Sequence, residues 1–162
     1  MNERPVDKFL REYNQIFKEN NDLYRGAAKA LGLSDTAFWI LYTLQDSHGM
    51  ATQREVCSML YEPKQTINSA LKKLEAEGSI EQVQGKDRRS KLVKLTEPGI
   101  RLAAKTADVV MDAEYRAFDN MPESEREQLL HLFSVYTKNL KKEMETSGLI
   151  SQKKKERDSK KK

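Results

Sequence analysis

The chain has 162 residues, of which 38% are hydrophobic and 33% charged, with only 7 glycines and 4 prolines. This length fits one compact domain with helical additions and excludes a second catalytic domain, and the composition favours a mainly α protein. No secretory signal pattern begins the sequence, and no apolar run approaches the roughly 18 residues of a membrane span, so we expect a cytoplasmic protein with no membrane partner.

Few residues suit metal binding or catalysis. Cys57 is the only cysteine, and His48 and His131 lie far apart in the sequence, so we expect no intrachain disulfide, no metal site and no cofactor. No nucleophile with a neighbouring base, no defined pair of carboxylates and no glycine-rich phosphate loop stands out. We therefore expect that the protein is not an enzyme.

The formal net charge of +4 is unevenly distributed. Residues 50–96 carry a net +3 and residues 147–162 a net +5, whereas residues 1–49 carry −1 and residues 97–146 carry −3. An anionic partner is therefore expected at the middle of the chain and at its tail.

Two helices are predicted in the N-terminal part. Apolar residues three or four positions apart predict a long helix from Pro5 to about Leu31, and Gly32 is a suitable stop. Ser34 is a good N-cap for a second helix, from Asp35 to about Gln45, with an apolar stripe and aromatic flanks.

A helix-turn-helix is predicted next. Thr52 and Glu55 have the spacing of a capping box and begin a short helix that runs to about Leu60. A turn at residues 61–63, with a proline, begins the following helix, and Gly78 ends it. The core side of the short helix is expected to consist of Val56, Cys57 and either Met59 or Leu60.

A wing and two more helices complete the prediction. Residues 80–84 and 91–95 are β-prone and flank a loop at residues 85–90, which predicts a β-hairpin directly after the helix-turn-helix. Thr96 begins a long helix to about Asn120, and after a break at Met121–Pro122 a last helix runs to about Met144. The fold class expected is mainly α with a small β-hairpin wing.

The helix after the turn has the character of a DNA recognition helix. Its apolar side contains Ile67, Ala70, Leu71 and Leu74, and its opposite side is short, polar and rich in hydrogen-bond donors. Gln and Asn can pair with adenine edges, and Ser and Lys reach phosphates or bases in the major groove. A solvated helix face is the alternative. The DNA contacts expected from this helix are Lys64, Gln65, Thr66, Asn68, Ser69 and Lys72.

Two segments beside this helix are also expected to contact DNA. The start of the preceding helix, at Thr52, Gln53 and Arg54, has free backbone N–H groups that suit a phosphate, and a helix cap alone is the alternative. The wing presents basic side chains that can enter the narrow minor groove, and a solubilising charged turn is the alternative. The wing contacts expected are Lys86, Arg88, Arg89 and Lys91.

These residues carry a family resemblance. The segment "ATQREVCSMLYEPKQTINSALKKLEAEGSIEQVQGKDRRSKLVKLTEPG" resembles the DNA-binding region of the multiple antibiotic resistance regulator (MarR) family of bacterial transcription factors, and "DRRSKLVKLTEPG" matches the family's wing pattern of Asp, any residue, Arg, a spacer, then Leu-Thr and Gly. The resemblance covers Phe9 to about Met144.

The resemblance implies a triangular homodimer whose first and last helices pair, so that two winged lobes bind double-stranded DNA at a pseudo-palindromic operator. These helices carry more apolar residues than one lobe can cover, and this excess agrees with a dimer. We therefore expect an N-terminal dimerisation helix at residues 1–32, the winged helix-turn-helix lobe at 33–98 and C-terminal dimerisation helices at 99–146. Residues 147–162 are expected to form a disordered lysine-rich tail. This tail either adds non-specific DNA affinity or aids solubility.

One departure from the family pattern concerns the wing. By the resemblance, Arg89 corresponds to the arginine at the wing tip and Asp87 to the acid two residues before it. Many members have an aspartate on the recognition helix that can pair with this arginine, but Lys72 stands there in this sequence. We therefore expect Asp87 to support Arg89.

Family members also commonly respond to small phenolic or anionic ligands in a cleft beside the dimerisation helices, or to oxidation of a cysteine. An aromatic set either lines such a cleft or packs in the core. Cys57 is expected to pack structurally, with peroxide sensing as the alternative. The aromatic set consists of Tyr13, Phe17, Tyr24, Phe38, Trp39 and Tyr42.

The function expected is that of a homodimeric, sequence-specific DNA-binding regulator, a repressor that a small aromatic or anionic effector releases. The alternative is a winged-helix protein-interaction module or anti-repressor that does not read DNA. Acidic residues on the outer side of the recognition helix would favour the alternative, and that side is basic and polar.

Overall fold

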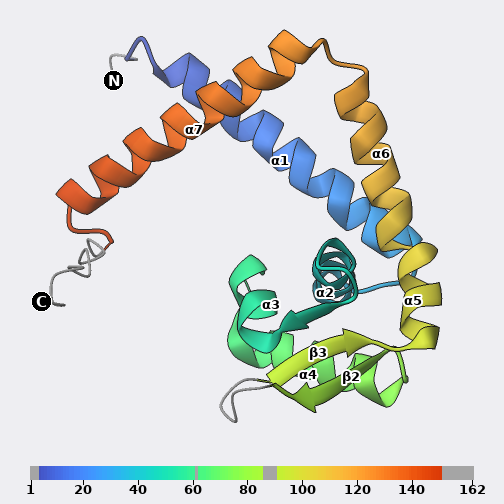
Figure 1. Cartoon of the computed structure of the whole chain (residues 1–162). Coiled ribbons are helices and arrows are strands. Elements are labelled where there is room, and N and C mark those ends of the chain that lie inside the picture. The colour runs from blue at the N-terminus through green and yellow to red at the C-terminus, as the bar shows by residue number, and fades with distance from the viewer. Residues whose placement is uncertain (1–3, 61, 86–90, 151–162) are drawn as a thin grey trace, which may run out of the picture. The chain divides into compact units, whose positions relative to one another are not determined.

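A computed structural model of the chain describes residues 4–60, 62–85 and 91–150 (Figure 1). The chain divides into two compact units, Met1–Glu114 and Tyr115–Lys162. Helix α6 (Ala107–Asp119) begins in the first unit and ends in the second. The described residues contain no helix long and apolar enough to cross a membrane.

The first unit begins with two helices, close to the bounds predicted. Helix α1 (Asp7–Ala30) is amphipathic, and only its Ala28 is buried. Helix α2 (Asp35–Asp46) begins at Ser34, whose side chain accepts a hydrogen bond from the backbone N–H of Ala37 at 3.2 Å. Most of α2 is buried, so this helix lies at the centre of the lobe.

Two shorter helices form the predicted helix-turn-helix. Helix α3 (Gln53–Met59) begins with the capping box, since the side chains of Thr52 and Glu55 bond each other's backbone N–H groups. Helix α4 (Lys64–Ala76) ends before Gly78, which has a φ of 72°. The lobe's core contains residues from α2, α3, α4, the strands and α5, among them Leu41, Leu44, Val56, Ile67, Leu71, Leu74, Ile80 and Val93.

The sheet has one strand more than the sequence predicted. Strands β2 (Ile80–Gln84) and β3 (Lys91–Leu95) form the expected antiparallel pair, with Ile80 opposite Leu95 and Gln84 opposite Lys91. A third strand, β1 (Met50–Thr52), pairs with the other edge of β3, so that β3 is central (Figure 1). Three residues are too few for an alternating pattern to predict a strand.

The predicted single helix from Thr96 to Asn120 is wrong, because the chain forms two helices there. Helix α5 (Glu97–Ala104) begins after the cap Thr96 as expected, but it ends at Ala104 with Lys105 as its C-cap, and α6 follows. The side chain of Thr106 donates to the backbone oxygen of Leu102 at 2.7 Å, and the backbone N–H of Thr106 bonds Ala103 three residues back. Such competition with the regular ladder bends or interrupts a helix.

The second unit consists of the end of α6 and helix α7 (Glu123–Thr146), separated by Met121–Pro122 as predicted. None of its described residues is buried. Its exposed large apolar side chains include Leu129, Leu130, Leu132, Phe133, Val135 and Leu140.

Candidate nucleic-acid interface

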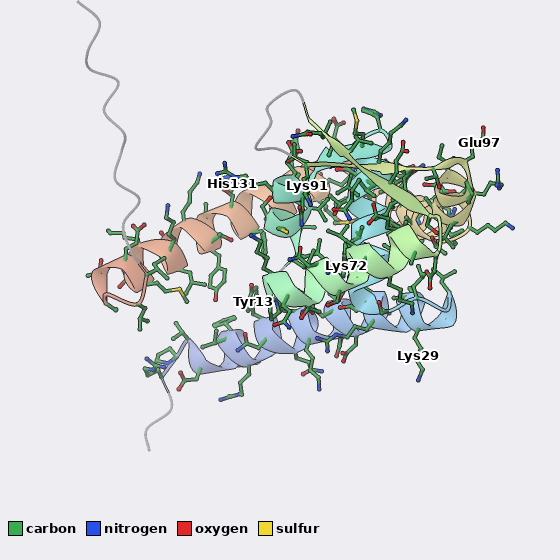
Figure 2. All side chains as sticks on the ribbon, turned by 90° about the horizontal axis from the view of Figure 1, so that it is seen from below. Tyr13, Lys29, Lys72, Lys91, Glu97 and His131 are labelled. Carbon is green, nitrogen blue, oxygen red and sulfur yellow. The ribbon has the colours of Figure 1, made fainter. Side chains whose placement is uncertain are left out.

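The outer face of α4 is defined here as the exposed polar side of this helix. Ile67, Leu71 and Leu74 are buried on the opposite side, as the spacing predicted. Figure 2 labels Lys72 on α4. All members of the outer face are exposed except Asn68, which is half-buried; the face consists of Lys64, Gln65, Thr66, Asn68, Ser69 and Lys72.

Two hydrogen bonds order this face. The side-chain N–H of Gln53, the first residue of α3, donates to Oδ1 of Asn68 at 2.8 Å and so joins the two helices. The hydroxyl of Ser69 donates to the backbone oxygen of Gln65 at 2.9 Å. Asn68 and Ser69 are therefore partly engaged within the protein.

The start of α3 is occupied by its own cap. The Glu55 carboxylate accepts from the backbone N–H of Thr52 and the Thr52 hydroxyl accepts from the N–H of Glu55, at 2.7 and 3.1 Å. These bonds hold the pKa of Glu55 below its usual value. Of the residues expected to bind phosphate here, Arg54 alone is an exposed cation, and Thr52 and Gln53 bond within the protein.

The cations of this region are not neutralised by the described acids. Arg54, Lys64, Lys72 and Lys91 make no salt bridge with any described residue, whereas Lys94 pairs with Glu81 at 3.3 Å. Glu75, near the C-terminal end of α4, accepts two hydrogen bonds from Gln82 on β2.

Most of the wing lies outside the described residues. Lys86, Asp87, Arg88 and Arg89 belong to the segment 86–90, so their predicted roles stay predictions. Lys91 begins β3 and is exposed (Figure 2).

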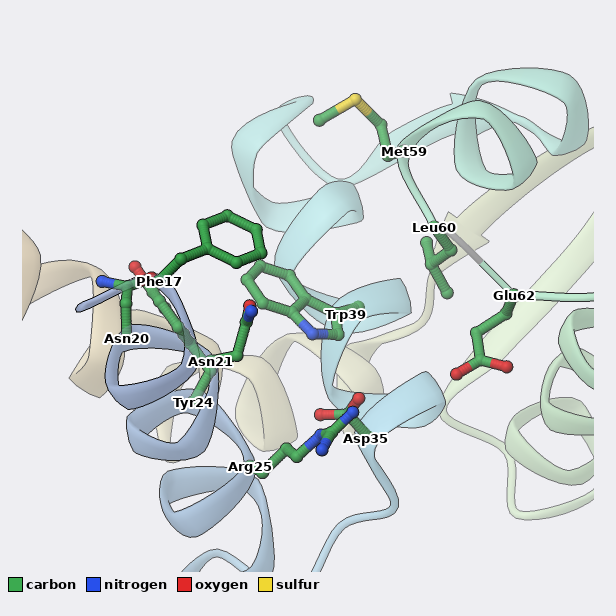
Figure 3. A pocket seen from close by; sticks show the side chains of 10 residues that line it. All are labelled: Phe17, Asn20, Asn21, Tyr24, Arg25, Asp35, Trp39, Met59, Leu60 and Glu62. Carbon is green, nitrogen blue, oxygen red and sulfur yellow. The ribbon is translucent and has the colours of Figure 1, made fainter. Parts of the chain in front are cut away.

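Half of the predicted aromatic set lines a pocket of about 420 Å³ in the first unit (Figure 3). Phe17 and Tyr24 come from α1 and Trp39 from α2. Tyr13, Phe38 and Tyr42 are not among its lining residues, and Phe38 is fully buried. No sequence pattern predicted the polar lining residues, which are Asn20, Asn21, Arg25, Asp35 and Glu62.

Two polar groups give the pocket a chemical character. Arg25 is exposed, and Oδ1 of Asp35 is buried with no hydrogen-bond partner among the described residues. A guanidinium can bind an anion, and an unpaired carboxylate oxygen can accept from a hydroxyl or amine.

Met59 also lines this pocket and is 62% exposed, so Leu60 rather than Met59 fills the core position predicted for either residue.

A residue that sequence reasoning missed joins three helices beside this pocket. Glu114 on α6 accepts hydrogen bonds from the hydroxyls of Tyr24 on α1 and Tyr42 on α2, the latter at 2.7 Å. Burial, then the hydrogen bond and charge of Glu114, raise the pKa of Tyr24 to about 12, and the same causes raise the pKa of Tyr42. Separations of 90 and 72 residues leave no local signal for this cluster.

The surroundings of Cys57 and of the possible metal ligands were also predicted. Cys57 is a free thiol and is half-buried against the core, so it is less enclosed than predicted. No group of three His, Cys, Asp or Glu side chains that could hold a metal occurs among the described residues.

Comparison with known proteins finds similarity to one family. Residues 31–90 match the model of the MarR family. A curated relative, the uncharacterised HTH-type transcriptional regulator YwoH of Bacillus subtilis, is 29% identical over 105 residues, which cover 65% of this chain and 76% of the relative.

Solved structures share the fold. NMB1585, a MarR family regulator from Neisseria meningitidis, aligns with a TM-score of 0.71 and 24% identity over 90% of this chain and 99% of the other. BpsR of Bordetella bronchiseptica, whose DNA binding is regulated by 6-hydroxynicotinic acid, aligns with a TM-score of 0.57 and 18% identity over 78% and 98%. The chain therefore has the winged helix-turn-helix fold of solved MarR family regulators, and its residues 31–90 are similar to that family of transcriptional regulators.

Proposed function

We propose that this chain is a homodimeric repressor that binds a pseudo-palindromic operator, with α4 in the major groove and the wing in the minor groove. The outer face of α4 carries the proposal, because it exposes Lys64 and Lys72 among polar side chains and has no acid between Pro63 and Leu74. An α-helix of this kind fits the major groove, where Gln, Asn, Ser and Lys contact base edges or phosphates.

The cations on this face and beside it argue against a protein-interaction module. Lys64, Lys72, Arg54 and Lys91 carry charges that no described carboxylate neutralises. Such free cations release counterions from DNA on binding, which favours a nucleic acid over a neutral or basic protein surface.

Specific retention on DNA tests the proposal. The protein is titrated against a duplex from the region upstream of its own gene and against a shuffled duplex, both with excess non-specific competitor. We expect retention of the upstream duplex only, and loss of transcription from that region in a purified system when the protein is added. Equal retention of both duplexes would contradict sequence-specific binding.

The wing has a separate test. Arg89→Ala is expected to weaken binding to the retained duplex, because an arginine in the narrow minor groove meets an enhanced negative potential. Arg116→Ala, a change of the same charge on α6, is the control and should bind like the wild type.

Exposed apolar side chains support the homodimer. On α1, Phe9 is 69% and Ile16 66% exposed, and α7 has no buried residue. Apolar surface of this extent on two long helices is typical of an interface between subunits. Two copies also present two α4 helices, as a pseudo-palindromic operator requires.

A small aromatic acid as effector is a second proposal, and the pocket supports it. Trp39 and Phe17 offer ring faces, Arg25 a cation and Asp35 an unpaired acceptor. BpsR is regulated by 6-hydroxynicotinic acid, which combines a ring, a hydroxyl and a carboxylate.

Trp39 provides the test, since it is the single tryptophan of the chain. We expect 6-hydroxynicotinic acid to quench the fluorescence of Trp39 saturably and to release the protein from the upstream duplex. Quenching should be weaker in Arg25→Ala, whereas Lys29→Ala, on the same helix, should be quenched as strongly as the wild type. Unsaturable quenching, equal in all three proteins, would overturn this second proposal.

A further inference from the structure

A hydrogen bond from Gln53 to Asn68 orients one amide on the outer face of α4 in this structure. Nε2 of Gln53 donates to Oδ1 of Asn68 at 2.8 Å, and both side chains are half-buried at the contact of α3 and α4. Nδ2 of Asn68 makes no hydrogen bond with a described residue. The oxygen of this amide is therefore directed at α3, and its two N–H donors remain for a partner.

This orientation changes what Asn68 can recognise. An asparagine that reads adenine needs both ends of its amide, because it donates to N7 and accepts from the N6 amino group. Asn68 has only its donor end to offer while Gln53 holds the oxygen. A donor suits an acceptor on a base edge, such as O4 of thymine or O6 and N7 of guanine. N7 of adenine also accepts, but it lies beside the N6 amino group, which needs the oxygen of the amide.

We propose that Gln53 is a positioning residue that sets base preference, because it holds Asn68 as a hydrogen-bond donor to guanine or thymine. The inference rests on the proposed function, since it assigns a role within an α4 that reads the major groove. Gln53 itself need not touch a base.

Selection of bound sequences from a random DNA library tests the inference. The base position that depends on Asn68 is identified first, as the position whose preference disappears in Asn68→Ala. In the wild type, we expect guanine or thymine to be enriched there. In Gln53→Ala the amide is free to turn, so enrichment should move to adenine.

Gln53→Glu gives an independent arm. A carboxylate can only accept, so Asn68 must turn its N–H groups toward residue 53 and its oxygen toward the DNA. The enriched base should then carry an amino donor, as cytosine and adenine do. A merely structural role for Gln53 would lower affinity without such a change of base.

Arg54→Ala is the matched control, because Arg54 is the next residue of α3, is exposed and makes no salt bridge with a described residue. It should weaken binding to all sequences alike and leave the preference unchanged. Circular dichroism and thermal unfolding of each variant confirm that the selected proteins are folded.

The outcomes separate the two proposals. Enrichment of one sequence with the same base at the Asn68 position in the wild type, Gln53→Ala and Gln53→Glu would overturn the inference and leave the proposed function intact. A preference for adenine over guanine at that position in the wild type would also overturn it, because only the N6 amino group of adenine needs the amide oxygen. A wild type that enriches no sequence would overturn the proposed function and this inference with it.

Discussion

Glu114 is the residue on which two tyrosine hydroxyls converge, and it shows what individual side chains contribute to the lobe. Tyr24 packs on Trp39 with ring centroids 5.0 Å apart, and Trp39 packs on Tyr42 at 5.2 Å. The cluster therefore combines aromatic contacts with two charge-assisted hydrogen bonds, which are about twice as strong as neutral ones. It holds α1, α2 and the start of α6 together beside the pocket.

This cluster makes stability depend on pH in the alkaline range. The pKa of Tyr24 is raised from 10.0 to about 12, and that of Tyr42 is raised as well, so the fold favours the protonated hydroxyls. Their contribution to the free energy of unfolding is fully present below about pH 10 and is lost as the pH rises to about 12. Thermal unfolding measured across this range should show the loss.

The double variant Tyr24→Phe/Tyr42→Phe is the control for that loss, because it has no hydroxyl to ionise at either position. It should be less stable than the wild type at neutral pH and should lose less stability between about pH 10 and 12. An identical alkaline decline in both proteins would show that the cluster does not titrate as described.

At the scale of the elements, the predictions that succeeded depended on neighbouring residues. Ser34, Thr52 and Thr96 each cap a helix, since the cap bonds backbone N–H groups within three residues. The strands β2 and β3 also have the bounds predicted, because alternation and the turn are local.

The features that were missed depend on distant partners or on very short segments. Strand β1 has three residues and is defined by its pairing with β3, some forty residues later. The break at Lys105–Thr106 interrupts an apolar pattern that continues across it. The Glu114 cluster and the bond between Gln53 and Asn68 join helices, so no periodicity of a single helix predicts them.

Gly99 gives a prediction for how α5 packs on the lobe. A Cβ on Gly99 would lie 1.8 Å from the backbone oxygen of Ser79, so a side chain there forces α5 away from the start of β2. Gly99→Ala should lower the free energy of unfolding by roughly 2–3 kcal/mol, as overpacking does. Chemical denaturation measures this loss.

Gly26 is the matched comparison, because a Cβ there meets nothing within 4 Å and the residue lies inside α1. Gly26→Ala should raise stability by about 0.5–1 kcal/mol, since alanine suits a helix better than glycine. Equal effects of the two substitutions would contradict the close packing of Gly99.

The whole molecule is expected to contain two copies of the chain, as proposed above. Sedimentation at equilibrium should give twice the 18.7 kDa of one chain. Leu130→Glu/Phe133→Glu places two charges on the exposed apolar side of α7 and should shift the protein toward one copy, with weaker DNA binding. Gln128→Glu/Ser134→Glu adds the same charges at exposed polar positions of α7, and this variant should remain a dimer.

The salt dependence of affinity for the upstream duplex tests whether the outer face of α4 binds DNA. The logarithm of the affinity should fall linearly with the logarithm of the salt concentration, and Lys72→Ala should reduce the slope by about 1, because one phosphate contact is lost. Lys29→Ala, on α1, should leave the slope unchanged. A slope near zero, or the same slope in all three proteins, would contradict DNA binding by this face.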